Sequence, residues 1–162
     1  MAYPTVDAPY GLIPINLIGG TPYAGSTRQI TIASNYNTNI FFGDVVKRVA
    51  DGTLEKDTGT STTATTGVIG VFMGCTFTDP NTNTKTFKQF YPANTVASDI
   101  KAYVVDDPNT LYKVAVVSSG TTIAGTGYTS IGSNAALVQN AGSTVTGNSK
   151  VAINGIATTL TL

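Results

Sequence analysis

The side chains of this sequence that could do chemistry are scattered carboxylates and a single thiol. The chain contains no histidine, which removes the commonest general base, the usual metal ligand and any serine–histidine–aspartate arrangement. With one cysteine and no histidine, a tetrahedral zinc site cannot be assembled. Cys75 lies in the apolar run 67–77 and has no cationic neighbour in sequence to activate it. We therefore interpret Cys75 as a buried hydrophobic side chain.

The remaining acidic groups are better explained as turns than as sites. Asp106 and Asp107 precede Pro108, which favours a turn, and adjacent strand residues point to opposite faces. The run Asp51–Asp57 has spaced acids but lacks the alternating oxygen ligands of a calcium loop. No glycine-rich stretch has the Gly-x-Gly-x-x-Gly pattern, between a strand and a helix, that binds phosphate. We expect no catalytic residue, no metal site and no cofactor, and therefore a protein that is not an enzyme.

Charge is scarce in this chain, and its scarcity restricts the class of partner. Of the 162 residues, 11% are charged, against about 25% in an average soluble protein. Nine basic and nine acidic residues cancel, whereas nucleic-acid binding needs clustered lysine and arginine. No apolar run approaches the roughly 20 residues of a membrane span. Since 41% of residues are hydrophobic, a packed core can form. We expect protein partners, with neither nucleic acid nor membrane.

Short β-branched segments separated by turn residues predict an all-β fold, either a small β-barrel or β-tulip-like domain or a sandwich. Strands are expected at 27–33, 40–49, 53–56, 68–78, 84–91, 101–105, 111–117 and 151–162. Residues 131–140 fit either a short helical turn or a strand. The segments 101–105 and 111–117 are expected to form a hairpin around the turn 106–109.

The strand expected at 68–78 has two unlike faces. Strict alternation places the bulky side chains on one face, namely Ile69, Val71, Met73, Cys75 and Phe77. The opposite face would carry Val68, Gly70, Phe72, Gly74 and Thr76. Its two glycines would let another strand or chain approach closely.

The first 25 residues differ from the rest of the chain. Prolines recur at positions 4, 9, 14 and 22 and prevent a helix, yet the intervening residues are apolar. One interpretation is an extended arm packed on a neighbouring subunit, and the other is a first strand packed in its own domain. We predict capsid or subunit contact for Tyr10, Leu12, Ile13, Ile15, Leu17 and Ile18. The predicted organisation is an extended N-terminal arm at 1–25, a main β-barrel domain at 26–117 and a Gly/Ser/Thr-rich β segment at 118–162 that completes the barrel or is annexed to it.

Five segments carry a resemblance to known proteins: YGLIPINLIGG (10–20), NIFFGDVV (39–46), GVIGVFMGC (67–75), AYVVDDP (102–108) and GSTVTGNS (142–149). They resemble structural proteins of tailed bacteriophages, particularly marine podovirus-like phages. The Gly-Asp-Val segment, followed by a Thr-rich loop and a Gly-Val-x-x-Gly strand, is similar to the small barrel of head-decoration (cement) proteins. The resemblance covers most of the chain, and its motifs are structural turns and strands.

The resemblance implies a β-barrel or β-tulip decoration protein that binds the outer surface of the phage head, often as a homotrimer. Its partners would be the major capsid protein and further copies of itself, and it would be located on the virion after assembly in the host cytoplasm. The N-terminal residues 1–7 lack the charged and apolar stretches of a signal peptide. Members of the family run on past a C-terminal Thr-Leu-x-Leu strand, so we expect the natural chain to continue beyond Leu162.

Two other classes of binding protein fit the same sequence. A receptor- or glycan-binding domain of a phage tail or fibre should show an exposed aromatic cluster in a loop. A bacterial surface domain would need a secretion signal. The absence of tryptophan slightly disfavours the glycan-binding class, because sugar sites favour large aromatic platforms.

Overall fold

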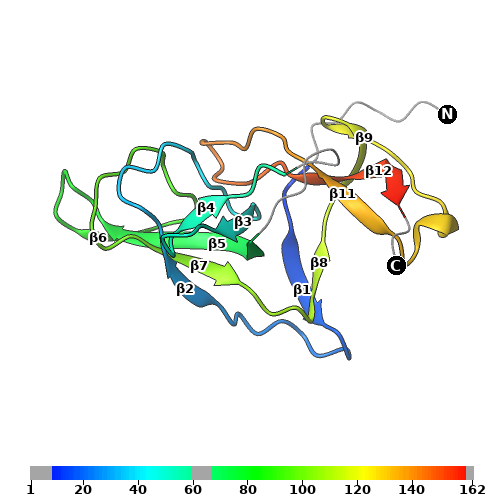
Figure 1. Ribbon diagram of the computed structural model, residues 1–162, viewed down its shortest axis with the longest axis horizontal. Helices are drawn as coiled ribbons and strands as arrows, with labels where there is room; N and C mark the ends of the chain where they lie inside the picture. The colour runs from blue at the N-terminus through cyan, green and yellow to red at the C-terminus, as the bar shows by residue number, and fades with distance from the viewer. Residues whose placement is uncertain (1–8, 60–66, 160–162) are drawn as a thin grey trace.

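The chain folds as an all-β protein, which confirms the predicted fold class. The structure is a computed structural model that describes residues 9–59 and 67–159, with side chains through residue 155. Within these ranges the strands form three sheets, and one 3-10 turn, η1, covers Tyr128–Ser130. Figure 1 shows the sheets following one another along the longest axis of the molecule: the main sheet, the ribbon β1–β8 and the C-terminal sheet.

The main sheet has six strands in the order β2-β7-β5-β3-β4, with β6 also paired to β5. Its strands are β2 (Arg28–Thr31), β3 (Val45–Arg48), β4 (Leu54–Lys56), β5 (Val68–Thr78), β6 (Lys85–Lys88) and β7 (Lys101–Val105). All their pairings are antiparallel. A parallel bridge joins Ile32, just after β2, to Leu54 at the start of β4, so the sheet curls round towards a barrel.

The curled sheet encloses one hydrophobic core of β-branched, aromatic and small side chains. Its buried members are Ile32, Ile40, Val46, Leu54, Phe72, Cys75, Phe77, Tyr91, Ile100, Ala102 and Val104. Burial of Cys75 was predicted from its apolar surroundings and is confirmed.

The strict alternation predicted for β5 is wrong, although its bounds are right. The register against β7 shifts between Phe72 and Gly74, and the register against β3 shifts between Val46 and Lys47. A β-bulge adds a residue to one strand, so the side chains beyond it change face. Phe72 therefore shares the core with Cys75, whereas Val71 lies on the opposite surface of the sheet, beneath the ribbon.

The ribbon consists of β1 (Ile13–Leu17) and β8 (Thr110–Lys113), paired antiparallel. Residues 13–17 thus pair within their own chain, which is the second of the two interpretations of the N-terminal segment. Residues 1–8 of the predicted arm lie outside the described residues.

The hairpin expected between 101–105 and 111–117 is wrong. One edge of β7 pairs with β2 and the other with β5, so β8 pairs with β1 instead.

The C-terminal sheet has the order β10-β9-β12-β11. It contains β9 (Val116–Ser119), β10 (Thr122–Ile123), β11 (Asn134–Val138) and β12 (Ala152–Thr159), and β12 runs parallel to β9. The strand expected at 111–117 is divided between β8 and β9, and the segment 131–140 contains a strand. The expected strand at 151–162 is present through Thr159, and its last three residues lie outside the described ranges. This sheet is annexed to the main sheet rather than continuous with it.

The loop 41–44 is where the three sheets meet. A parallel bridge pairs Phe42 with Asn148, in the segment that leads to β12. The Leu12 amide, just before β1, donates to the Gly43 carbonyl at 3.0 Å. Gly43 has φ +88°, and a side chain there would press on the backbone of Leu12, so glycine permits this close approach.

Candidate functional site

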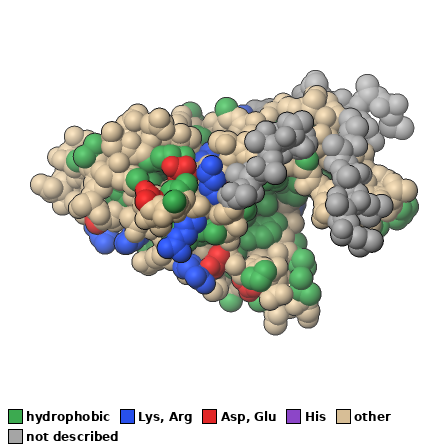
Figure 2. All heavy atoms as spheres, viewed as in Figure 1, with side chains coloured by type: hydrophobic (Ala, Val, Ile, Leu, Met, Phe, Trp, Pro, Cys, Tyr) green, Lys and Arg blue, Asp and Glu red, His purple; other side chains and the backbone are tan. Residues whose placement is uncertain are grey.

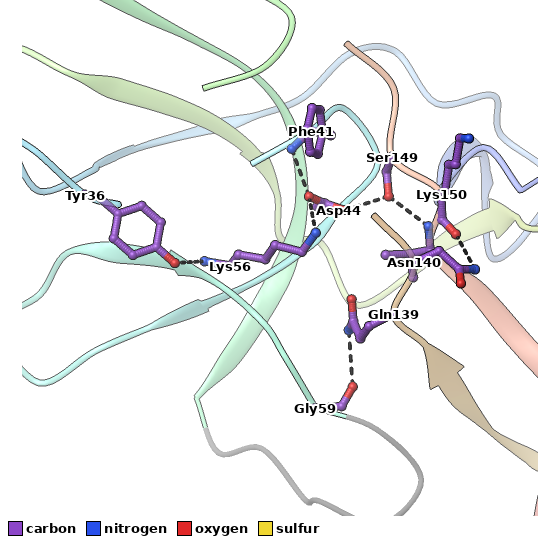
Figure 3. A network of polar contacts seen from close by, with 10 residues as sticks. Tyr36, Phe41, Asp44, Lys56, Gly59, Gln139, Asn140, Ser149 and Lys150 are labelled. Carbon is purple, nitrogen blue, oxygen red and sulfur yellow. Dashed lines mark hydrogen bonds and ion pairs between the residues drawn. The ribbon is translucent and has the colours of Figure 1, made fainter. Parts of the chain in front are cut away.

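A buried polar cluster surrounds Asp44 at this junction (Figure 3). One carboxylate oxygen, Oδ2, accepts a hydrogen bond from the Phe41 amide at 2.8 Å and forms an ion pair with Lys56 Nζ at 3.0 Å. The other oxygen, Oδ1, accepts the Ser149 hydroxyl at 2.6 Å. The Ser149 hydroxyl oxygen in turn accepts the Val151 amide at 3.0 Å. The cluster therefore ties β4, the loop 41–44 and the segment before β12 together.

The contacts of the Asp44 cluster are structural rather than catalytic. Asp44 and Ser149 are fully buried, so no substrate can reach the hydroxyl in this structure. Lys56 contacts the carboxylate and not the hydroxyl, so it does not act on Ser149 as a base. Buried charges are tolerated when they are paired, and here Asp44 pairs with Lys56 while each of its two oxygens accepts a hydrogen bond.

The six predicted contact residues lie in β1 or just before or after it, but they differ in exposure. Ile15 and Ile18 are 47% and 65% exposed. Half-buried positions are held by Tyr10, Leu12, Ile13 and Leu17. Tyr10 packs under Lys113, whose Nζ lies 5.7 Å from the ring centroid. Only Ile15 and Ile18 therefore offer large apolar surface to another molecule.

Leu111 on β8 is a further exposed apolar residue of the ribbon, and sequence reasoning did not select it. It lies opposite Asn16 and is 43% exposed. Its neighbours Thr110 and Tyr112 face the main sheet, so alternation along β8 turns Leu111 outward. Alternation along β8 predicts the outward position of Leu111 only when the strand that pairs with β8 is known. We call Ile15, Ile18 and Leu111 the apolar ribbon edge.

Beneath the ribbon lies a hollow of about 320 Å³ with an apolar floor. Val71 and Val105 form its floor on the main sheet, while Leu12 and Tyr112 contribute from the ribbon side. Figure 2 shows hydrophobic side chains gathered between the main sheet and the ribbon. The ribbon thus covers one part of the outer surface of the main sheet, and Ile15, Ile18 and Leu111 do not line the hollow beneath it.

Within residues 9–59 and 67–159, no group of three or more acidic or cysteine side chains is placed to hold a metal ion. Over the same residues, no helix is long and apolar enough to cross a membrane. No family model, curated protein or solved structure matches this chain.

Proposed function

We propose that this chain is a non-enzymatic structural protein that decorates the outer surface of a tailed-phage head and acts by protein–protein contact. The observation that supports this most is the apolar ribbon edge on a chain with so few charges. Its partners would be the major capsid protein and further copies of itself in a homotrimer, on the virion surface.

The apolar ribbon edge supplies a modest contact energy for each copy. Burying one large aliphatic side chain contributes about 1.5–3 kcal/mol, and these three are already partly covered. Many copies on a symmetric shell would add avidity, so single contacts need not be strong. Binding only the assembled shell would stabilise it by mass action. The zero net charge keeps repulsion among crowded copies low.

The location can be tested by immunogold electron microscopy of phage particles purified from a lysate that contains this protein. We expect gold on the heads. Label confined to tails or fibres would favour the receptor-binding alternative, and unlabelled particles would rule out a virion role. Light scattering of the purified protein should give the mass of a trimer.

The contact itself can be tested with Ile18→Asp, measured by cosedimentation with heads stripped of this protein. Because Ile18 is exposed, the aspartate should leave folding intact and lower head binding at least tenfold, since it must be desolvated in the contact. Val96→Asp is the matched control, because Val96 is 59% exposed but lies in the loop before β7. Equal binding by both variants would remove the ribbon edge from the model. Substitution is preferable to deleting residues 1–20, which would leave β8 without its partner β1.

A further inference from the structure

The outer surface of the main sheet carries a row of side chains in register, away from the ribbon. Thr31 on β2 lies opposite Lys101 on β7, which lies opposite Thr76 on β5, which lies opposite Phe87 on β6. Side chains of directly opposed residues point to the same face of an antiparallel sheet. The neighbouring pair Cys75 and Ala102 is buried in the core, so the row faces outward.

Phe87 is held over the sheet as an exposed aromatic platform. It is 61% exposed, and its ring centroid lies 6.0 Å from that of Tyr103, the next outward residue of β7. Gly74 lies opposite Tyr103, and a Cβ at this position would be only 2.7 Å from Phe87 Cζ. Gly74 has φ +134°, which side chains rarely adopt, so the β5 bulge and the glycine together make room for the ring.

Two lysines flank the platform on either side of β5. Lys101 lies on β7, where its Nζ donates to Thr31 Oγ1 at 2.7 Å, and Lys85 lies on β6 opposite Thr78. Neither lysine forms an ion pair with a residue in the described ranges. The carboxylate of Asp99 lies beside Thr78, whose amide and hydroxyl donate to it at 2.9 and 2.8 Å. These bonds and, to a smaller extent, the charge of Lys85 lower the pKa of the Asp99 carboxyl, so Asp99 is an anion next to Lys85. Figure 2 shows basic side chains along the lower margin of the main sheet. Two lysines against one carboxylate leave this face with a net charge of one positive unit, mainly at Lys101.

We propose that this face binds an acidic polysaccharide, a chain of sugars that carry carboxylates. The apolar C–H face of a pyranose ring would stack on Phe87, and its carboxylates would pair with Lys101 and Lys85. The hydroxyls of Thr31 and Thr76 and the amide of Gln29, opposite Tyr103, offer hydrogen bonds to sugar hydroxyls. Two lysines are too few for a nucleic acid, and an acidic protein surface would not require the exposed ring.

This inference goes beyond the proposed decoration function, because the row lies on the main sheet and not on the ribbon edge. It is also distinct from the aromatic loop cluster expected of a receptor-binding domain, since Phe87 and Tyr103 belong to strands. A decoration protein could use the two surfaces at once, with the ribbon on its neighbours and the sheet face towards solvent.

The inference is tested by calorimetric titration of the full chain with hexagalacturonate, maltohexaose and a polyglutamate of matched charge. We expect binding to hexagalacturonate that weakens with salt, and at least tenfold weaker binding to the other two ligands. Equal binding to polyglutamate would overturn the inference, since charge alone would then explain the face. Equal binding to maltohexaose would overturn the role of the lysines, and no binding to hexagalacturonate would overturn the whole inference.

Variants locate the binding on this face. Phe87→Ala should lower the affinity for hexagalacturonate at least tenfold, and Lys101→Gln should lower it severalfold and reduce its salt dependence. Both side chains are exposed, so the thermal unfolding of the variants should match that of the parent. Tyr128→Ala is the matched control, because Tyr128 is 93% exposed and lies in η1, outside the main sheet. Binding that survives Phe87→Ala, or that falls equally in Tyr128→Ala, contradicts the assignment.

Discussion

At the residue scale, burial determines the chemistry of Cys75. Its side chain is enclosed in the main core, and its Sγ lies 3.7 Å from the Phe90 carbonyl oxygen. Burial raises the pKa of the Cys75 thiol to about 12, although the positive charge of Lys88 acts in the opposite direction. The thiol is therefore protonated and enclosed, which agrees with its interpretation as a hydrophobic side chain.

The raised pKa of Cys75 predicts a loss of stability in alkali. The unfolded chain releases this proton near pH 9.0 and the folded chain only near 12, so the contribution is complete below pH 9.0 and is lost as pH rises towards 12. Over this range Cys75 should steepen the fall in the free energy of unfolding by up to about 1.4 kcal/mol per pH unit. Burial also raises the pKa of Tyr91, so part of the slope should remain without the thiol.

Urea unfolding of the parent and of Cys75→Ala at several pH values between 8 and 11 checks this. The variant is expected to start less stable at pH 8, because a methyl group fills less of the core, and to lose stability more slowly with pH. The slopes are compared rather than the absolute values. Parallel slopes for the two proteins would show that the thiol does not contribute.

At the element scale, the packing of β5 against β7 depends on glycine. A Cβ at Gly70 would collide with the carbonyl oxygen of Val105, a backbone atom that cannot move without disturbing the sheet. The sequence indicates that β5 has a face thinned by glycine, and the structure identifies what approaches Gly70. The group that approaches Gly70 is the end of β7 in the same chain.

Gly70→Ala should therefore destabilise the protein by about 2–3 kcal/mol or more through overpacking, as measured by urea unfolding. Gly127→Ala is the matched control: its φ is −84°, and a Cβ would meet nothing closer than 3.7 Å, so a change within about 1 kcal/mol is expected. Equal effects of the two substitutions would mean that the collision at β7 is relieved at little cost.

At the scale of the whole molecule, the Asp44 cluster joins the main sheet to the C-terminal sheet. Ser149→Ala removes the donor to Asp44 and the acceptor of the Val151 amide, all in a buried environment. Losing a buried hydrogen bond to a charged group costs about 1.5–3 kcal/mol. Because the cluster connects both sheets, we expect this loss to lower the stability of both.

Hydrogen exchange of amides in β7 and β12 measures the two sheets separately. Ser149→Ala should reduce the free energy of opening by similar amounts in both sheets. Val145→Ala, at a side chain that is 94% exposed in the same loop, should change neither by more than about 0.5 kcal/mol. Reduced protection in β12 alone would mean that the sheets unfold independently.

The sequence by itself determined the fold class, the bounds of β5 and β7, the burial of Cys75 and the lack of any histidine chemistry. These properties follow from local composition and alternation, which act over a few residues. Only the tertiary structure decided which strands pair. Both edges of β7 are paired, one with β2 and one with β5, so β8 cannot pair with it. It also decided the Asp44–Ser149 contact, which spans 105 positions, and the platform at Phe87, which needs the register of β6, β5 and β7. Such contacts depend on which surfaces are still unpaired when the chain comes together, and no local pattern contains that information.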